Sequence, residues 1–239
     1  MIGWYAMKKI FRGQGLVEYA ILISLIAVGV GLALNLYGVS VRDAYCYAAD
    51  KVSGGEACKP VLVCEDDFSA DLAEWNAIQG KNGKIADGKF CPISYALSLN
   101  ACSMSKDLDN YIVTINDVTL SSGSGYGIVF RAENPPNGMT GYVFQYDPGY
   151  YPGSFIIRKW VNGRELSVPI AVAKAPGYNW YNTPHDLSVV VKDNTFTAYV
   201  DGVEVVAAQD SSYPTGGAGI RTWDSTLVCL DQFQIQLIP

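Results

Sequence analysis

The residue with the clearest chemical demand is Glu18, a carboxylate at the start of a long apolar segment. The 23 residues from Tyr19 to Val41 contain no charged side chain. An ionised side chain inside a membrane-spanning helix costs about 2.5–3.5 kcal/mol on insertion scales, so Glu18 needs a partner of opposite charge. The chemistry predicted at this position is therefore an ion pair in apolar surroundings.

A helix must position Glu18, because the apolar segment has the length of a membrane span. At a rise of about 1.5 Å per residue such a helix covers about 35 Å, and a bilayer core is about 30 Å thick. Lys8, Lys9 and Arg12 precede the segment. The positive-inside bias then keeps this end in the cytoplasm and exports the remainder. A plain membrane anchor satisfies the same observations.

The stretch Arg12–Tyr19 resembles the processing region of type IV prepilins, and its Glu-Tyr pair resembles the Flp/Tad-like kind. In that family a prepilin peptidase cuts after the glycine, which implies cleavage between Gly13 and Gln14. The resemblance also implies that Glu18 of one subunit pairs with the new amino group of Gln14 in a neighbour. Tyr19 is assigned to the same assembly contact, with an aromatic residue at the membrane interface as the alternative.

Composition limits what the rest of the chain can do. The chain has 239 residues, enough for one sizeable domain or two after the helix. Residues 1–13 carry +3, and the remaining 14 basic and 23 acidic residues give about −9, which argues against nucleic acid as a partner. Six cysteines, all beyond the apolar segment, predict disulfides formed in an oxidising compartment.

The usual catalytic motifs are missing from the sequence. His185 is the sole histidine, and no serine lies in a nucleophile motif that it would serve. The sequence also contains neither a glycine-rich phosphate loop nor a zinc-ligand cluster. We therefore predict that the protein is not an enzyme and needs no cofactor, with structural Ca²⁺ as the one candidate exception.

From Val61 onward the sequence has the period of β-strands. Hydrophobic and polar residues alternate in Leu187–Lys192 and Thr195–Val200. Turn pairs separate such runs, and they are Asn82-Gly83, Asp87-Gly88, Asn137-Gly138, Asn162-Gly163 and Asp201-Gly202. The predicted fold class is α+β: a long N-terminal hydrophobic helix followed by a large antiparallel β-sandwich. The predicted organisation is a leader at 1–13, a stalk helix at 14–49, a linker at 50–60 and the sandwich at 61–239.

Segments of the second part resemble the concanavalin A-like lectin/glucanase superfamily in its laminin G-like branch. They are Asp66–Trp75, Ser122–Glu133, Gly141–Asp147, Lys192–Val205, Gly216–Trp223 and Leu230–Gln236. The match implies a jelly roll over almost all of residues 64–238. It implies little about function, because this fold hosts lectins, hydrolases and structural domains. The closely spaced acids of the glucanases have no counterpart here.

We predict three disulfides, and they are Cys46–Cys58, Cys64–Cys229 and Cys91–Cys102. The first would join the two ends of the linker. The second follows from the resemblance, because the first and last strands lie side by side in that fold. The third flanks a segment long enough for two short strands. Six cysteines allow 15 connectivities, so the pairing is a choice among many.

The resemblance also implies a place for a ligand, since the sandwich relatives bind ligands on a concave sheet. Sugar recognition uses aromatic faces and planar polar groups. The candidates for that face are Arg131, Gln145, Arg158, Trp160, Arg221 and Trp223. Arg131 is placed there because it shares strand parity with Val129. The alternative is that these aromatic residues pack the core and the arginines pair with acids.

Calcium is the second candidate ligand. Asp67 follows the first predicted strand and Asp231 precedes the last, and jelly rolls often hold a structural Ca²⁺ through such carboxylates. A solvated acidic surface is the alternative. The two aspartates are thus the predicted metal ligands.

These observations together predict a structural subunit of a Flp/Tad-like type IV pilus. The subunit would form a helical homo-oligomer through its N-terminal helix and display a lectin-like sandwich for coating or adhesion, with carbohydrate as a partner. It would reside in the cytoplasmic membrane before the prepilin peptidase and the pilus assembly machinery place it in an extracellular pilus. The alternative is a membrane-tethered glycan-binding or glycan-hydrolysing protein whose helix is only an anchor.

Overall fold

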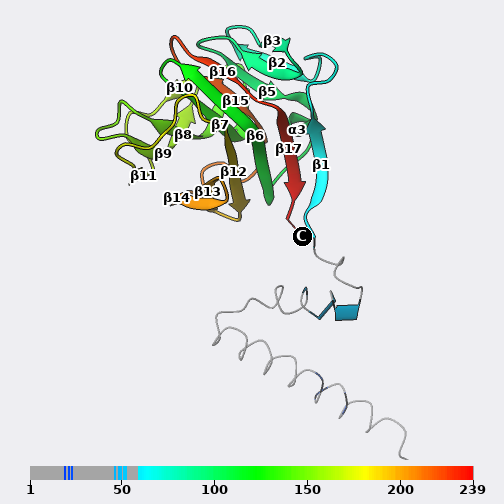
Figure 1. Cartoon of the computed structure of the whole chain (residues 1–239). Helices are drawn as coiled ribbons and strands as arrows, with labels where there is room; N and C mark the ends of the chain where they lie inside the picture. The colour runs from blue at the N-terminus through cyan, green and yellow to red at the C-terminus, as the bar shows by residue number, and fades with distance from the viewer. Residues whose placement is uncertain are drawn as a thin grey trace, which may run out of the picture. The chain divides into compact units, whose positions relative to one another are not determined.

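The computed structural model describes residues 59–238 and a few residues before them, which are Tyr19, Ile21, Ile23, Cys46, Ala48, Ala49, Lys51 and Val52. These isolated residues are helical. Contacts divide the chain into two compact units, Met1–Lys59 and Pro60–Pro239 (Figure 1). Within the described part, no helix has the length and apolar character of a membrane span. The leader, the extent of the stalk helix and most of the linker lie outside the described residues and stay predictions.

One sheet of the sandwich has seven strands and contains both ends of the domain. Its order is β1 (Val61–Asp66), β17 (Gln232–Leu237), β6 (Tyr111–Ser122), β12 (His185–Lys192), β13 (Thr195–Val200) and β14 (Val203–Gln209), with β16 (Leu227–Cys229) also paired to β6. All the pairs are antiparallel. The first and last strands are neighbours, as the resemblance implied.

The other sheet has eight strands. Its order is β10 (Arg164–Glu165), β9 (Ser154–Val161), β8 (Thr140–Asp147), β7 (Tyr126–Glu133), β15 (Gly217–Thr222), β5 (Leu97–Asn100) and β2 (Trp75–Gln79), with β11 (Ala171–Lys174) also paired to β9. A separate hairpin joins β3 (Gly83–Ala86) to β4 (Lys89–Pro92), and a short helix α3 (Ala101–Met104) follows β5. The predicted antiparallel β-sandwich is confirmed.

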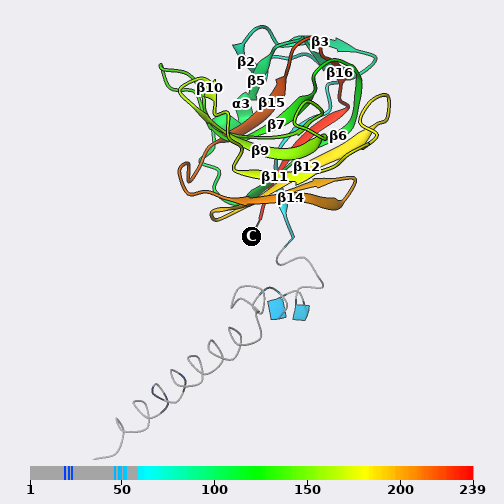
Figure 2. The same ribbon diagram turned by 90° about the vertical axis from the view of Figure 1, so that its left-hand side faces the viewer.

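The core lies between the two sheets, which Figure 2 shows as layers. Period-two alternation fills it, because every second residue of β12 and β13 points inward: Leu187, Val189 and Val191 are fully buried, as is Phe196. The Asp201-Gly202 pair forms the predicted two-residue hairpin between β13 and β14. Both residues have positive φ, 53° and 75°, as a tight primed turn requires.

The disulfide pairing predicted for the sandwich is wrong. Cys64 is bonded to Cys102 and Cys91 to Cys229, with Cα–Cα separations of 5.9 and 4.2 Å. Strand β1 does pair with β17, but the register places Cys64 opposite Ile235. Cys229 instead lies on β16, where it meets the β3–β4 hairpin. The physical reason is therefore register. Two cysteines can bond across neighbouring strands only where they lie opposite each other, and Cys64 and Cys229 do not.

The remaining predicted bridge is only partly described. Cys46 is disulfide-bonded, and its predicted partner Cys58 lies outside the described residues. The Cys46–Cys58 pairing therefore stays a prediction.

Peptide mapping without reduction tests the two bridges of the sandwich. We expect linked peptides that join Cys64 to Cys102 and Cys91 to Cys229, because only these pairs lie within bonding distance. Replacing both Cys91 and Cys229 by Ser should lower the free energy of unfolding by about 2–5 kcal/mol, since that bridge closes a long loop. A peptide that links Cys64 to Cys229 would contradict the structure.

Candidate functional site

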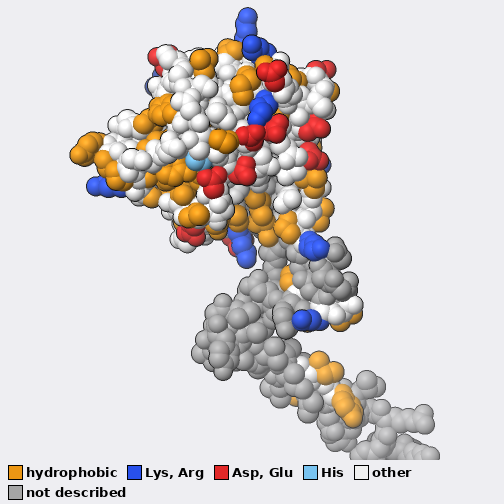
Figure 3. All heavy atoms as spheres, in the orientation of Figure 1, with side chains coloured by type: hydrophobic (Ala, Val, Ile, Leu, Met, Phe, Trp, Pro, Cys, Tyr) orange, Lys and Arg blue, Asp and Glu red, His pale blue; other side chains and the backbone are white. Residues whose placement is uncertain are grey.

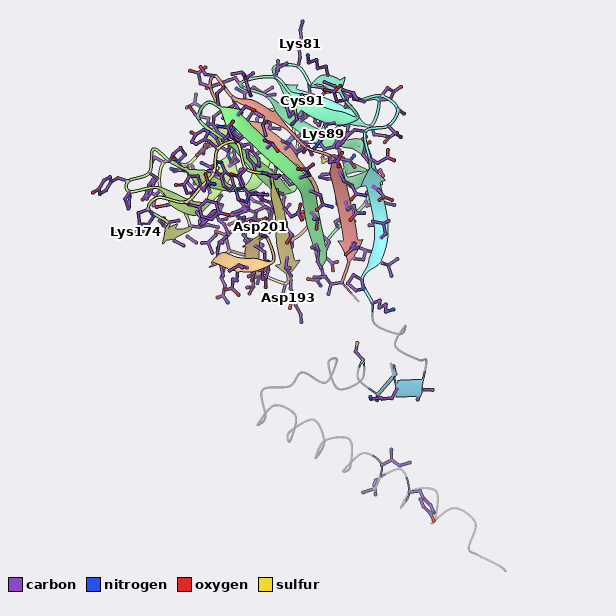
Figure 4. All side chains as sticks on the ribbon, in the orientation of Figure 1. Lys81, Lys89, Cys91, Lys174, Asp193 and Asp201 are labelled. Atoms are coloured by element: carbon purple, nitrogen blue, oxygen red, sulfur yellow. A yellow bond between two sulfur atoms is a disulfide. The ribbon has the colours of Figure 1, made fainter. Side chains whose placement is uncertain are left out.

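The outer faces of the two sheets differ in chemistry. The seven-stranded sheet carries a charged network in which Lys89 pairs with Asp117, and the Asp117 backbone N–H donates to Asp186. His185 and Asp201 continue it at 2.8 Å. Figure 3 shows acidic side chains gathered on this side, and Figure 4 labels Lys89 and Asp201 there. The outer face of the eight-stranded sheet is instead apolar and aromatic.

Successive residues of each strand point to opposite sides of the eight-stranded sheet, and the side chains on both sides are buried. Along β8, Tyr142 and Phe144 point into the main core, and Val143 and Gln145 point away from it. A second, smaller hydrophobic cluster covers the outer side, and its members are Leu97, Leu99, Val129, Ala132, Met139, Val143 and Trp160, with Ile78, Met104 and Trp223 at its edge.

Arg221 is held between two indole rings on this face. Its guanidinium carbon lies 4.2 Å from the ring centroid of Trp160 and 4.9 Å from that of Trp223. Nη1 donates to Oε1 of Gln79 at 3.0 Å, and the exposed Tyr95 ring lies 5.8 Å away. Arg221 itself is only 4% exposed. Stacking on two aromatic faces stabilises a guanidinium that is largely removed from water.

Glycines allow these side chains to meet. Arg221 is on β15 and Trp160 on β9, and strands β7 and β8 lie between them. The register places Gly127 opposite Arg221 and Gly141 opposite Trp160. Because neither glycine has a side chain, long side chains from distant strands can reach across the intervening ones.

Arg158 has a fuller set of partners than Arg221. Its Nε lies 2.7 Å from Glu165 and its Nη2 3.7 Å from Asp147. Nη1 donates to the carbonyl oxygens of Leu166 and Ser167. Two carboxylates and two carbonyl oxygens therefore surround this guanidinium.

Glu165 reaches the face through the short strand β10. The Asn162-Gly163 turn returns the chain so that Glu165 pairs with Trp160. Burial raises the pKa of the Glu165 carboxyl, and Arg158, Arg221 and a hydrogen bond from Trp223 lower it only in part. Burial likewise lowers the pKa of the Arg221 guanidinium, while Glu165 acts in the opposite direction. The charged forms of Glu165 and Arg221 thus stabilise each other.

Several polar atoms of this face are buried without a hydrogen-bond partner among the described residues. They are Oε1 of Gln145, Nε1 of Trp160 and the Nε atoms of Arg158 and Arg221, of which Arg158 Nε lies close to a Glu165 oxygen without the geometry of a hydrogen bond. Such atoms are uncommon in folded proteins, because each one gives up its hydrogen bonds to water. These atoms show that polar groups lie beneath the aromatic rings of this face.

The structure therefore gathers five of the six predicted glycan residues on one face: Gln145, Arg158, Trp160, Arg221 and Trp223. Sequence reasoning missed Glu165, Gln79 and Tyr95. The Asn162-Gly163 turn was a usable signal for Glu165, since a two-residue turn after Trp160 returns the chain alongside it. No local pattern pointed to Gln79 or Tyr95.

Arg131 does not lie on this face, so that prediction is wrong. It has a positive φ of 48° at a β-bulge, where the register between β7 and β8 shifts after Phe130. The bulge turns its side chain to the opposite side of the sheet, where the guanidinium lies near Phe196 of the main core. It donates to the backbone carbonyl oxygens of Asp109, Asp193 and Tyr213. Arg131 thus joins three loops.

The predicted calcium ligands gain no support from the geometry. Asp67 accepts a hydrogen bond from the Ser69 backbone N–H, which makes it a turn-capping residue. In residues 59–238 and the few described before them, no three His, Cys, Asp or Glu side chains come together as a metal site would need. The calcium prediction at Asp67 and Asp231 stays untested.

Most of the predicted N-terminal site lies outside the described residues. This holds for Gly13, Gln14 and Glu18. Tyr19 is described and is 71% exposed.

Comparisons with solved structures identify the fold of the sandwich. The chain is similar to the carbohydrate-binding module CBM66 from Bacillus subtilis, at 22% identity over 66% of this chain and 94% of that one, with a TM-score of 0.54. It is similar to a β-1,3-1,4-glucanase (lichenase) from a mouse hindgut metagenome, at 12% identity over 74% and 100%, TM-score 0.55. It is also similar to the κ-carrageenase of Pseudoalteromonas carrageenovora, at 12% identity over 76% and 96%, TM-score 0.51. No family profile and no curated protein matches the sequence.

At these identities the likeness establishes the fold alone. The domain is a concanavalin A-like, galectin-like β-sandwich of the kind found in carbohydrate-binding modules and glucanases. The fold is compatible with binding and with catalysis, so the function must be argued from the site.

Replacing Arg131 tests its reassignment from ligand binding to structure. We expect Arg131→Ala to lower the free energy of unfolding by about 3–5 kcal/mol, because the backbone carbonyl oxygens of three loops lose their shared donor. Urea unfolding measures the change, and Arg164→Ala, which removes an exposed arginine, is the control. An Arg131→Ala protein as stable as the control would refute the structural role of Arg131.

Proposed function

We propose that the sandwich is an extracytoplasmic carbohydrate-binding domain that uses the outer face of its eight-stranded sheet. The observation that carries this proposal is the convergence of Trp160, Trp223, Arg158, Arg221 and Gln145 on one face. Indole rings supply the apolar surfaces on which sugar rings stack. The arginines, Gln145 and Glu165 supply planar polar groups for hydroxyls.

The structural neighbours support the same proposal. One is a carbohydrate-binding module, one is a glucanase, and one is a κ-carrageenase in complex with an oligotetrasaccharide of κ-carrageenan. The two disulfides of the sandwich support an oxidising, extracytoplasmic location.

We propose binding without hydrolysis. A glycosidase uses one carboxylic acid to protonate the leaving group and a second carboxylate on the other side of the bond. Glu165 and Asp147 are the carboxylates near Trp160 and Arg221, and both contact Arg158. Because both carboxylates contact the same guanidinium, they are not placed on opposite sides of one glycosidic bond. Incubation with bound polysaccharide should accordingly release no reducing ends.

Trp223→Ala tests the binding face. We expect roughly tenfold weaker binding to any glycan that the full-length chain selects on an array, because a stacked aromatic ring is lost. Isothermal titration in a neutral detergent measures it. Tyr199→Ala is the matched control, since Tyr199 lies on the outer face of the other sheet. Equal binding by Trp223→Ala and the wild type would refute the proposed face.

A second function, filament assembly, rests on residues 12–41 of the sequence. Here the proposal is that Glu18 pairs with the amino terminus of a neighbouring subunit and that the sandwich is displayed on the resulting pilus. An ion pair buried between subunits explains why a carboxylate is kept in an apolar helix. Both functions can belong to one protein, because they use different parts of the chain.

Processing and assembly test this second function. We expect the protein from its native host to begin at Gln14, as measured by intact mass. Glu18→Ala should abolish filaments seen by electron microscopy and leave the sandwich folded, because an unpaired ammonium would be buried. Glu18→Asp keeps the charge and should assemble better than the alanine variant. A chain that retains Met1 would favour a plain anchor, and normal filaments from Glu18→Ala would contradict the proposed ion pair.

A further inference from the structure

The Arg221 guanidinium carries a buried charge that no carboxylate balances at close range. It forms no ion pair with any described residue, although it is 4% exposed. Its one hydrogen bond goes to the neutral amide oxygen of Gln79. Burying a charge without a paired counter-charge is unfavourable, and cation–π contacts offset only part of that cost.

Arg158 lies on the same face, and carboxylates balance the charge of its guanidinium. It contacts both Glu165 and Asp147 and donates to two backbone carbonyl oxygens. Arg158 is therefore paired with carboxylates, whereas Arg221 forms an ion pair with none of the described residues. Nε of Arg221 is buried without a partner, and Nη2 has no partner among the described residues and is not fully buried.

Resting on the carbohydrate function proposed above, we propose that the ligand is an acidic saccharide whose carboxylate or sulfate pairs with Arg221. The sugar ring would lie over Trp223 and the exposed Tyr95, whose rings lie 4.9 and 5.8 Å from the guanidinium carbon. A planar guanidinium already oriented by two indoles suits a carboxylate or sulfate, because little side-chain entropy is lost on pairing. The anion supplies a counter-charge in direct contact with Arg221, whereas Glu165 acts on it without forming an ion pair.

The acidic groups nearby set the pH dependence of this site. Glu165 is the nearest, and it is faced by Arg158, Arg221, Asp147 and Trp223. Its raised pKa means that it binds a proton at a higher pH than an ordinary glutamate, and protonation removes a negative charge beside Arg221. Binding of an acidic saccharide should therefore strengthen as the pH falls from 7 to 5, a range in which sugar carboxylates and sulfates stay ionised.

Matched pairs of polymers test the proposal on the full-length chain. The probes are polygalacturonate with its carboxyl-reduced neutral counterpart, and dextran sulfate with dextran. We expect at least tenfold tighter binding to one acidic member than to its neutral partner, and the pair that responds identifies carboxylate or sulfate. Arg221→Gln should abolish the difference. Lys192→Gln removes one exposed positive charge from the other sheet and should leave the difference unchanged.

A second variant guards against misfolding of the first. Glu165→Gln mimics the protonated carboxyl, so it should bind the acidic polymer more tightly at pH 7 and lose most of the pH dependence. Near-ultraviolet circular dichroism checks that each variant is folded.

The outcomes separate this inference from the proposed function. Neutral polymers bound as tightly as acidic ones, with Trp223→Ala still deleterious, would overturn the acidic ligand and keep the carbohydrate function. Acidic binding that survives both Arg221→Gln and Trp223→Ala would show non-specific charge attraction and overturn the inference. Binding to no polymer and to no array glycan would overturn both.

Discussion

The arrangement of the sandwich depends on one constraint: both faces of the eight-stranded sheet must be buried. The residues that point inward and those that point outward along each strand therefore both need packing partners. In β7, β8 and β15 almost every residue is buried, the inward set against the other sheet and the outward set beneath the second cluster. A sheet covered on one side only would alternate between buried and exposed residues, as β12 and β13 do. The outward set holds the candidate site, so packing and function share the same residues.

Two arginines of this sheet illustrate how backbone geometry decides what a side chain does. Arg131 and Arg221 lie on paired strands, and both are almost fully buried. A bulge turns Arg131 toward the loops, where backbone carbonyl oxygens take up its donors. Arg221 remains in regular alternation and points to the outer face, where it has aromatic neighbours and few acceptors. The same residue type is therefore structural at one position and available to a ligand at the other.

The two proposed functions of this chain use different residues and do not depend on each other. In the sequence, the carboxylate of Glu18 directly precedes an apolar segment, and in the structure the Arg221 guanidinium lies among aromatic rings. Both proposals rest on the same principle, that a charge with little access to water takes a partner of opposite sign. For Glu18 that group is proposed to be a second subunit, and for Arg221 a saccharide.

Local patterns in the sequence were enough to determine the class of the sandwich and the strands around the Asp201-Gly202 turn. These features follow from period-two alternation and turn chemistry, which act between residues close in the chain. Five of the six residues predicted for the ligand face lie on it, and they were proposed through the family resemblance. The tertiary structure alone decided the disulfide partners of Cys64 and Cys91, the bulge at Arg131 and the meeting of Arg221 with Trp160. The disulfides and the meeting of Arg221 with Trp160 join segments far apart in the sequence, and the bulge is a change of register that no local pattern specifies, although a shift of one residue reverses the direction of every side chain.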